Sequence, residues 1–384
     1  MNVKAGTVLS GPMYAAKAMK ICFFISSMNV GGAERQASAL CNHWAGQGHD
    51  VLLVIHRGGA SHYPLHPSIR QRVIPATGLG ALAHIRSLVR DERPGVAISF
   101  INTMNVKLVL ALLWTGVPVV ISERSVLSSL SLAGGRLRAG IFALLRRVFY
   151  PFARALVVQS RMVADEARKL RLSRNVQVIS NASFPAPVSN LVRDGKTVLA
   201  VGRLGPEKGH DVLVRAFALV AAQYPGWRVK IVGTGPCSAM LKDLARRLGV
   251  QDRVDFAPVM RDIWPAYQAA EIFVLPSRLE GFPNVLVEAM RAGCAVVISD
   301  CPGAGTEIIS DGQDGLVFRT DDAQGLAERL AELMADPRKR AAMGERARKS
   351  VTRYDPEVIL PIWDRLIEAG AAPAAQDGRP AASR

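Results

Sequence analysis

The chain lacks any uninterrupted apolar run near the roughly 20 residues that a membrane-spanning helix requires. Cysteine is also scarce, and the five cysteines are odd in number and lack the spacing of metal ligands: Cys22, Cys41, Cys237, Cys294 and Cys301. These absences argue against a disulfide framework and a zinc module. We therefore expect reduced structural thiols in a cytoplasmic protein that is soluble or peripheral to a membrane.

The chain has few acidic residues: it contains 48 lysines and arginines but only 32 aspartates and glutamates, which gives a formal net charge of +16. Such a surface favours an anionic partner. Nucleic acid is one candidate, but the sequence has no zinc spacing, basic and aromatic RNA-binding run or DNA-reading helix, so no specific nucleic acid is expected.

A membrane surface fits this charge better, because residues 134–154 have the composition of a basic amphipathic helix that lies on anionic lipid. Their cations are Arg136, Arg138, Arg146, Arg147 and Arg154, among the apolar Ile141, Phe142, Leu144, Leu145, Val148, Phe149 and Tyr150. The alternative is an ordinary buried helix with a basic exposed edge.

A chain of 384 residues is long enough for two domains of ordinary size. Apolar strand candidates alternate with helical patterns in two series, which predicts an α/β protein made of two doubly wound domains facing across a cleft. A linker is expected at 183–195, where prolines and polar residues interrupt the pattern. The expected strands are Ile21–Ile25, Val51–Ile55, Val96–Phe100, Val117–Ile121, Leu156–Gln159 and Val176–Ile179, then Val198–Val201, Val229–Val232, Val254–Ala257, Ile272–Leu275 and Val296–Ser299.

The most informative segment runs from Glu280 to Glu288 through Gly-Phe-Pro-Asn-Val-Leu-Val. Pro283 suits a first helical turn, so a helix is expected to begin there. The backbone N–H groups of Asn284, Val285 and Leu286 would then face a phosphate. Glu288 lies one turn deeper on the face of Asn284 and can accept from two ribose hydroxyls. The alternative is two surface glutamates near a helix start, where acids are favoured anyway.

A second pattern places two cations between an expected strand and a helix, in Gly202-Arg203-Leu-Gly-Pro-Glu-Lys208-Gly209. Ligands of open α/β sheets bind at such turns. Arg203 can hold phosphate oxygens through two parallel hydrogen bonds, and Lys208 adds a mobile point charge. A solvated charged turn is the alternative, but the glutamate segment downstream favours a phosphate site.

Together these motifs resemble the large retaining glycosyltransferase family, glycosyl transferases group 1, which has the GT-B fold and uses nucleotide-sugar donors. The resemblance covers about residues 20–368 and includes Gly31-Gly-Ala-Glu-Arg, Val232-Gly233-Thr-Gly-Pro and Asp311-Gly…Gly315-Leu-Val. The amino-acid sequences of the glutamate segment and of Ile121-Ser-Glu-Arg124 resemble those of family members that add N-acetylgalactosamine or a related sugar to lipid-linked oligosaccharides.

The resemblance implies how the chain is divided. Residues 1–18 form a flexible extension or an early start-codon assignment. The acceptor-side domain occupies 19–190, and the nucleotide-sugar domain occupies 191–352. A helix at 353–370 returns to brace the first domain, and 371–384 form a disordered tail.

The resemblance also implies the chemistry. Arg203, Lys208 and Glu280 form the catalytic set, in which the cations stabilise the departing diphosphate and Glu280 orients the transferred sugar. The donor, which is expected to be UDP-linked, contacts Gly31, Gly32, Gly233, Asn284, Val285, Leu286 and Glu288. No Asp-x-Asp motif is present, so no metal and no cofactor are expected.

On the acceptor side, Gly31 and Gly32 permit a close backbone approach to the donor or the acceptor, although they also suit a plain tight turn. Many relatives carry a histidine after a first-domain strand, and this chain lacks it. Asn105, Glu123 and Arg124 thereby become candidate acceptor contacts, whereas His210 is expected in a surface turn.

The sequence therefore predicts a retaining transferase that acts on a lipid-linked glycan acceptor at the cytoplasmic face of the membrane. A nucleotide-sugar epimerase of the same architecture is one alternative, and a basic nucleic-acid-binding protein is another. A dinucleotide oxidoreductase is disfavoured, because the first glycine cluster lacks the Gly-x-Gly-x-x-Gly spacing.

Overall fold

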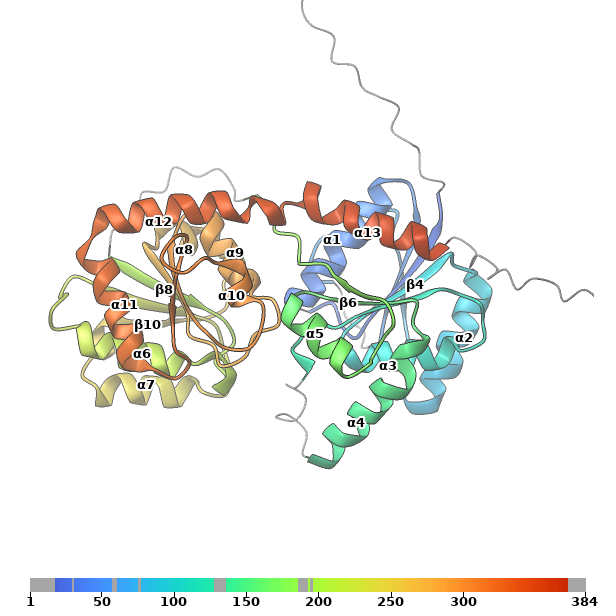
Figure 1. Cartoon of the computed structure of the whole chain (residues 1–384), viewed down its shortest axis with the longest axis horizontal. Coiled ribbons are helices and arrows are strands. Elements are labelled where there is room, and N and C mark those ends of the chain that lie inside the picture. The colour runs from blue at the N-terminus through green and yellow to red at the C-terminus, as the bar shows by residue number, and fades with distance from the viewer. Residues whose placement is uncertain are drawn as a thin grey trace, which may run out of the picture.

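The computed structural model describes residues 18–29, 31–56, 61–74, 77–127, 136–185, 193 and 196–371. The expected extension and tail therefore lie outside the described residues, except for Ala18 and Ala371. Most of the expected linker lies outside them as well. Two parallel sheets stand side by side in the described chain (Figure 1).

The first sheet has seven parallel strands in the order β3-β2-β1-β4-β5-β6-β7. They are β1 (Lys20–Ile25), β2 (Asp50–Ile55), β3 (Arg70–Val73), β4 (Val96–Phe100), β5 (Val119–Ser122), β6 (Ala155–Val158) and β7 (Val176–Val178). The sequence analysis missed β3, because an exposed edge strand with the sequence Arg-Gln-Arg-Val has no apolar signal.

Helices cover both faces of this sheet. Alternate residues of β1 pack into different cores: Ile21, Phe23 and Ile25 meet residues of α1, whereas Cys22 and Phe24 meet residues of α2 and α3. This two-sided burial explains why the strand is apolar from Ile21 to Ile25. The helices are α1 (Gly32–Gly46), α2 (Gly78–Glu92), α3 (Asn102–Leu112), α4 (Arg136–Phe149) and α5 (Arg161–Lys169). A 3-10 turn, η2 (Tyr150–Phe152), directly follows α4.

The second sheet has six parallel strands in the order β10-β9-β8-β11-β12-β13. The strands are β8 (Thr197–Val201), β9 (Arg228–Val232), β10 (Val254–Ala257), β11 (Ile272–Leu275), β12 (Ala295–Ser299) and the unpredicted β13 (Leu316–Phe318). The helices are α6 (His210–Val220), α7 (Ser238–Arg247), α8 (Trp264–Ala269), α9 (Asn284–Arg291), α10 (Gly305–Ile308), α11 (Ala323–Ala335) and α12 (Pro337–Ser350).

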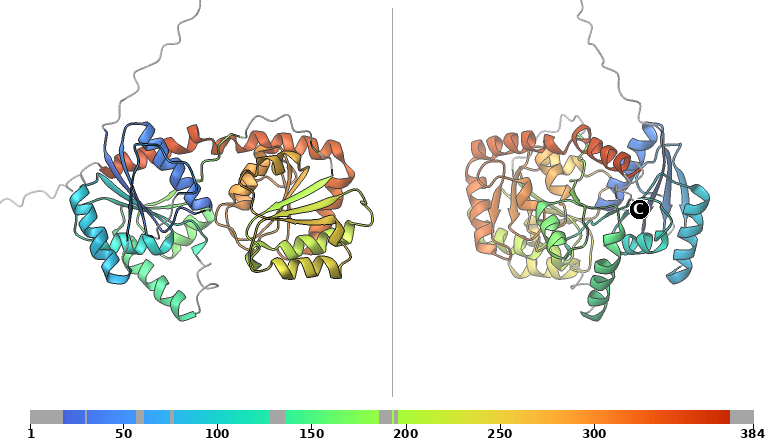
Figure 2. Two further views of the ribbon diagram at one scale, coloured as in Figure 1. Left: turned by 180° about the vertical axis from the view of Figure 1, so that it is seen from behind. Right: turned by 45° about the vertical axis from the view of Figure 1, so that its right-hand side comes forward.

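The last helix, α13 (Pro356–Ala371), continues along the edge that α12 follows and packs against the first domain (Figures 1 and 2). Its Trp363 ring lies 5.8 Å from Phe100 and 6.5 Å from Trp44, measured between centroids. Asp364 accepts a hydrogen bond from Trp44 Nε1 at 3.0 Å. The chain therefore begins and ends its folded part on the same domain, which holds the two domains together.

One buried apolar cluster runs through this junction from the first sheet to the second. It includes Phe23, Trp363 and Tyr354, together with Phe282 and Phe273 of the second domain. Rings of Phe282 and Tyr354 meet edge to face at 5.5 Å. Close packing of this kind fixes the relative positions of the strand ends. Within the part of the chain described above, no helix is both long and apolar enough to cross a membrane.

The contact between Asp364 and the first domain makes a stability prediction. Asp364→Ala should lower the melting temperature by a few degrees, as a loss of roughly 2 kcal/mol does, because several donors lose a charged acceptor. Glu368→Ala, an exposed position on the same helix, is the control and should leave it unchanged. Equal losses in scanning fluorimetry would contradict the bracing role of Asp364.

The same contact has a defined pH dependence. Burial acts to raise the pKa of Asp364, but hydrogen bonds from His43, Gln47 and Trp44 outweigh it and leave the pKa below its ordinary value. The stabilisation is therefore complete above about pH 4 and is lost as the pH falls through the folded-state pKa. The difference in melting temperature between wild type and Asp364→Ala should shrink in that acidic range.

Candidate active site

A cavity of about 750 Å³ lies between the two domains, at the carboxyl ends of the strands of both sheets. Ligands of open α/β sheets bind at this edge. Most of the residues expected from the sequence line it: Gly31, Gly32, Arg203, Lys208, Gly233, Glu280, Asn284, Val285 and Glu288. Leu286 does not, because its side chain is fully buried in the core.

Helix α9 begins at Asn284, one residue after Pro283, which is its N-cap. The expectation of three free backbone donors is wrong in part. The N–H of Asn284 donates to the carbonyl of Phe282 at 3.0 Å, and the N–H of Leu286 donates to that of Pro283 at 3.0 Å. Of the three, only Val285 keeps a backbone N–H without a partner in the described chain. The helix start therefore offers one backbone donor and the Asn284 side chain to a ligand.

Glu288 projects from α9 into the cavity and is only 6% exposed. Both of its oxygens have partners: Arg35 of the first domain donates to Oε1, and the Tyr267 hydroxyl donates to Oε2 at 2.9 Å. Burial raises the pKa of Glu288, although Arg35 and Tyr267 act in the opposite direction. The carboxylate is thus an acceptor held in place by donors from two domains.

Lys208 and Glu280 form the second pair at the cavity wall. The Lys208 ammonium lies 2.6 Å from Glu280 Oε1, and the Ser277 hydroxyl donates to the same oxygen at 2.7 Å. Lys208 comes from the 3-10 turn η3 (Pro206–Lys208), and Gly209 follows in a left-handed conformation with φ +63°. A Cβ there would stand 1.9 Å from the Pro276 carbonyl oxygen, so glycine is required for the turn to approach the Glu280 loop.

Arg203 follows β8 and is the most exposed of the predicted cations, with 67% of its side chain accessible. Its guanidinium binds Glu207 Oε1 at 2.9 and 3.1 Å. An exposed pair of this kind is weak. Arg203 can therefore exchange Glu207 for a stronger anion at little cost.

The glycines of the cavity allow backbone segments to meet closely. Gly233 has φ +155°, and a Cβ on it would lie 1.9 Å from the Gly202 carbonyl oxygen. A Cβ on Gly32 would lie 2.6 Å from Asn284 Nδ2, across the domain boundary. The Tyr63 hydroxyl bonds both the N–H and the carbonyl of Gly31 at 3.2 and 3.0 Å, which fixes the first glycine loop.

Two expected acceptor contacts do not reach the cavity. Asn105 and Glu123 are both buried, and they share a network in which Tyr150 donates to Glu123 and Ser99 donates to Asn105 at 2.7 Å. Their polar groups hold the carboxyl ends of β4 and β5 together. The prediction that they contact an acceptor is therefore wrong for this conformation.

The expectation of a surface position for His210 is also wrong. His210 opens α6 and is only 3% exposed, and neither ring nitrogen has a hydrogen-bond partner in the described chain. Burial and the neighbouring Lys208 lower the pKa of His210 to about 4. The imidazole is therefore neutral near pH 7 and lies behind the cation of the site rather than in solvent.

The sequence analysis missed the role of three polar side chains of the cavity wall: Arg35, Tyr63 and Tyr267. Arg35 stood in the quoted glycine motif, one helical turn after Gly32, and this spacing was the available signal. Tyr63 and Tyr267 carried none, since each lies far along the chain from the motif that it supports.

A carboxylate also joins the two domains beside the cavity. Glu307 of α10 accepts hydrogen bonds from the backbone N–H groups of Arg161 and Met162, both at 2.9 Å. These groups open α5, where a negative charge is favoured by the helix dipole. With the pair between Arg35 and Glu288, this contact closes the domains over the cavity.

The arrangement suits a ligand with a diphosphate between two hydroxyl-rich groups. Arg203 and Lys208 provide positive charge, and Glu288 and Glu280 provide acceptors on either side. No group of three or more residues that could hold a metal ion occurs in the described ranges.

Sequence profiles of two families match the chain in succession. The profile of Glycosyltransferase Family 4 matches residues 30–182, and that of glycosyl transferases group 1 matches residues 182–350. The boundary between them falls close to the junction between the two sheets.

Relatives match over nearly the whole chain. A Campylobacter jejuni α-1,4-N-acetyl-D-galactosaminyltransferase that acts on an undecaprenol-linked oligosaccharide is 27% identical over 91% of this chain and 98% of its own. A glycosyltransferase of Haemophilus influenzae is 26% identical over 91% of this chain and 99% of its own.

Solved structures share the fold. Sucrose-phosphate synthase from Thermosynechococcus elongatus aligns with a TM-score of 0.80 at 19% identity, over 91% of this chain and 98% of its own. Anabaena HepE in complex with UDP-glucose aligns with a TM-score of 0.78 at 22% identity, over 91% of this chain and 100% of its own. The chain is therefore a glycosyltransferase of the GT-B fold that joins a Glycosyltransferase Family 4 domain to a glycosyl transferases group 1 domain.

Proposed function

We propose that this glycosyltransferase moves a hexose or N-acetylhexosamine from a UDP-linked donor to a lipid-linked glycan acceptor, with retention of configuration, in polysaccharide or glycoconjugate biosynthesis. The observation that carries the proposal is the cavity in which two cations and two buried carboxylates surround the start of α9. The complex of HepE with UDP-glucose supports a UDP-linked donor. The Campylobacter relative supports a lipid-linked acceptor.

We place the donor in the cavity by matching its groups to these side chains. Its diphosphate lies against Arg203, Lys208 and the free N–H of Val285, and its ribose hydroxyls donate to Glu288. The sugar then reaches Glu280. When the nucleotide leaves, negative charge grows on the β-phosphate, and fixed cations that bind this charge more strongly lower the barrier.

Donor binding changes the contacts of Glu288. Arg35 donates to one of its oxygens and Tyr267 to the other, and each oxygen has a second lone pair that can accept from a ribose hydroxyl. Arg35 also lines the cavity, so its guanidinium can bind the diphosphate.

Retention of configuration is achieved by transfer on one face of the sugar, where the leaving phosphate takes the acceptor proton. Lys208 and Ser277 both bind Oε1 of Glu280 and fix the position of the carboxylate. These contacts hold the carboxylate as an orienting group that stabilises positive charge on the sugar ring.

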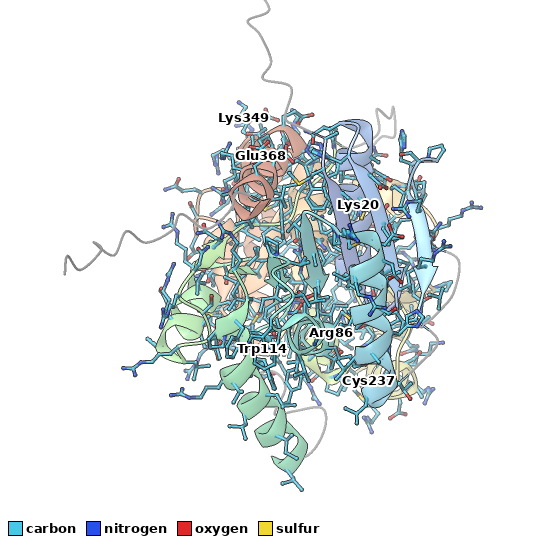
Figure 3. All side chains as sticks on the ribbon, turned by 90° about the vertical axis from the view of Figure 1, so that its right-hand side faces the viewer. Lys20, Arg86, Trp114, Cys237, Lys349 and Glu368 are labelled. Atoms are coloured by element: carbon cyan, nitrogen blue, oxygen red, sulfur yellow. The ribbon has the colours of Figure 1, made fainter. Side chains whose placement is uncertain are left out.

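The first domain provides a surface for anionic membrane at the cytoplasmic face. Helix α4 projects from this domain (Figures 1 and 3). It carries an exposed apolar stripe. Leu137, Ile141, Leu144 and Val148 recur every three or four residues on this stripe and are between 47% and 77% exposed. A helix with an unpartnered apolar face suits the membrane interface.

The cations of this surface differ from those expected. Arg146 is buried and donates to the Leu127 carbonyl at 3.2 Å, so it faces inward. Arg147 and Arg154 are exposed, and the side chains of Arg136 and Arg138 lie outside the described residues. A groove of about 1100 Å³ is lined by four arginines: Arg86, Arg90, Arg93 and Arg154. The exposed Phe152, which lies just after α4 in the chain, also lines it.

This groove strengthens the membrane proposal. Its lining contains no acidic residue. Trp114, which is 89% exposed, adjoins it in the chain (Figure 3). Arginines with exposed aromatic rings are suited to phosphate headgroups at a bilayer surface.

The donor is tested with a panel of UDP- and GDP-sugars and membrane-extracted lipid acceptors. Nucleotide release should depend on the acceptor, and Lys208→Ala should lower the turnover about a hundredfold, by analogy with loss of an oxyanion donor. Arg203→Ala should also lower it. Lys242→Ala, an exposed lysine on α7, should have no effect.

Other outcomes of this panel would contradict the proposal. Release without acceptor would favour an epimerase. Release that survives Lys208→Ala and Arg203→Ala would place the active site elsewhere. Salt-dependent binding of nucleic acid, with no release from any donor, would favour a binding protein.

The ribose contact predicts a separation of kinetic constants. Glu288→Gln and Tyr267→Phe should raise the donor KM tenfold or more with little change in kcat, because a ribose contact is made equally in the ground state and the transition state. Tyr224→Phe, which removes a hydroxyl bonded to the Ala331 carbonyl at 3.2 Å, is the control. A fall in kcat at constant KM would argue against ribose binding at Glu288.

If the exposed apolar residues of α4 insert into a membrane, one charged substitution among them should weaken membrane binding. Leu144→Glu should reduce sedimentation with phosphatidylglycerol vesicles at least tenfold, because a buried leucine contributes about 2 kcal/mol and a charge opposes burial. Leu219→Glu is the control, since Leu219 is equally exposed but lies on α6 of the second domain. Equal binding by both variants would contradict the membrane role of α4.

A further inference from the structure

Arg124 occupies an unusual position at the boundary between the domains. It follows β5 of the first domain, and its backbone meets the loop before α9. A Cβ on Gly281 would lie 2.6 Å from the Arg124 carbonyl oxygen. Any change in the surroundings of Arg124 is therefore close to the donor cavity, although its side chain does not line that cavity.

The guanidinium of Arg124 is held without a counter-ion. It lies over the Phe100 ring, 3.5 Å from its centroid, and Nη1 donates to Asn181 Oδ1 at 2.6 Å. Nε and Nη2 are closed to solvent and have no hydrogen-bond partner in the described residues. No carboxylate pairs with it there, because the adjacent Glu123 binds Tyr150 instead. Burial lowers the pKa of Arg124 to about 9.

A buried charge without a counter-ion destabilises a fold. A stacked aromatic ring compensates for this only in part. Because the described residues supply no anion, we expect the counter-ion of Arg124 to be a ligand. The hydrogen bonds of Arg124 indicate where that ligand lies.

Two side-chain hydrogen bonds connect Arg124 to the donor cavity. Asn181, which receives the bond from Arg124, donates through Nδ2 to Asn284 Oδ1 at 2.8 Å. Because Oδ1 of Asn284 faces Asn181, its Nδ2 faces the opposite way, toward Gly32. Asn284 and Gly32 both line the cavity at the start of α9.

We propose that Arg124 is a positioning residue for the donor diphosphate, which acts as its missing counter-ion. Arg124 acts through Asn181 to aim the Asn284 amide at the phosphate, and its charge adds to the potential at the start of α9. Coulomb attraction between the guanidinium and a diphosphate is stronger in a partly desolvated cleft than in bulk water. The inference rests on the proposed function, since it requires a diphosphate in this cavity.

The test measures the melting temperature of the ligand-free protein and the calorimetric affinity for UDP and for uridine. Arg124→Met keeps the contact with Phe100 and removes the charge. It should leave the melting temperature unchanged or higher, weaken UDP binding at least tenfold and leave uridine binding unchanged. If Arg124 were purely structural, Arg124→Met would have a lower melting temperature and would lose affinity for UDP and for uridine equally. That result would overturn the proposal.

A second variant tests the same proposal by supplying a counter-ion for Arg124 within the protein. Asn181→Asp gives Arg124 a carboxylate within the protein and removes the amide that donates to Asn284, so it should weaken UDP binding selectively. Arg124→Lys should recover part of the UDP affinity lost in Arg124→Met. Arg253→Met is the control, since Arg253 lies 5.4 Å from the centroid of the Phe217 ring, on the opposite end of the second domain, and should not alter UDP binding.

The two proposals fail in different ways. If the wild type binds UDP, and Arg124→Met and Asn181→Asp bind it equally well, the inference about Arg124 is wrong and the proposed function stands. If the wild type binds neither UDP nor GDP, the proposed function is wrong, and the inference falls with it.

Discussion

Pairing between cations and carboxylates in and around the cleft is the interaction on which the rest of the site depends. Arg35 binds Glu288 across the domain boundary, whereas Lys208 with Glu280 and Arg203 with Glu207 pair within the second domain. In a partly buried cleft, an unpaired charge would destabilise the fold. A ligand that carries both a diphosphate and hydroxyl groups matches both signs of charge, because the phosphate binds cations and the hydroxyls donate to carboxylates.

The fold brings these pairs together with two sheets that point the carboxyl ends of their strands at one cavity. Helix α13 returns to the first domain, and a continuous apolar core passes from Phe23 through Trp363 and Tyr354 to Phe282. Because this core is close-packed, the loops on either side of the cavity keep a fixed separation. Contacts such as Glu307 with the start of α5 then add specific closure.

Arginines serve different purposes according to their depth in this chain. Arg203 is exposed and bound to an acid that it can release, whereas Arg146 is buried and helps to hold α4 against its domain. Arg124 is enclosed without an acid, next to the donor cavity. The high positive charge of the sequence is therefore distributed over arginines with different surroundings, some exposed and some buried.

Strands buried on both sides, such as β6 and β11, could be located from the sequence because every residue in them is apolar. Strand β3 could not, since an exposed edge strand has no such pattern. Among site residues, Lys208, Glu280 and Glu288 could be identified because the chemistry lies within short motifs. Tyr63, Tyr267 and Asn181 could not, because each meets its partner only after distant segments fold together.

The sequence by itself determined the fold class and identified most of the charged residues of the cavity, though not the role of Arg35, since strand pattern and motif spacing are local properties of a chain. Only the tertiary structure decided which charges pair, which backbone donors remain free and which polar residues are buried. Leu286, Asn105 and His210 were misplaced for that reason. Burial and pairing depend on what packs against a residue, and that information is spread over the whole chain.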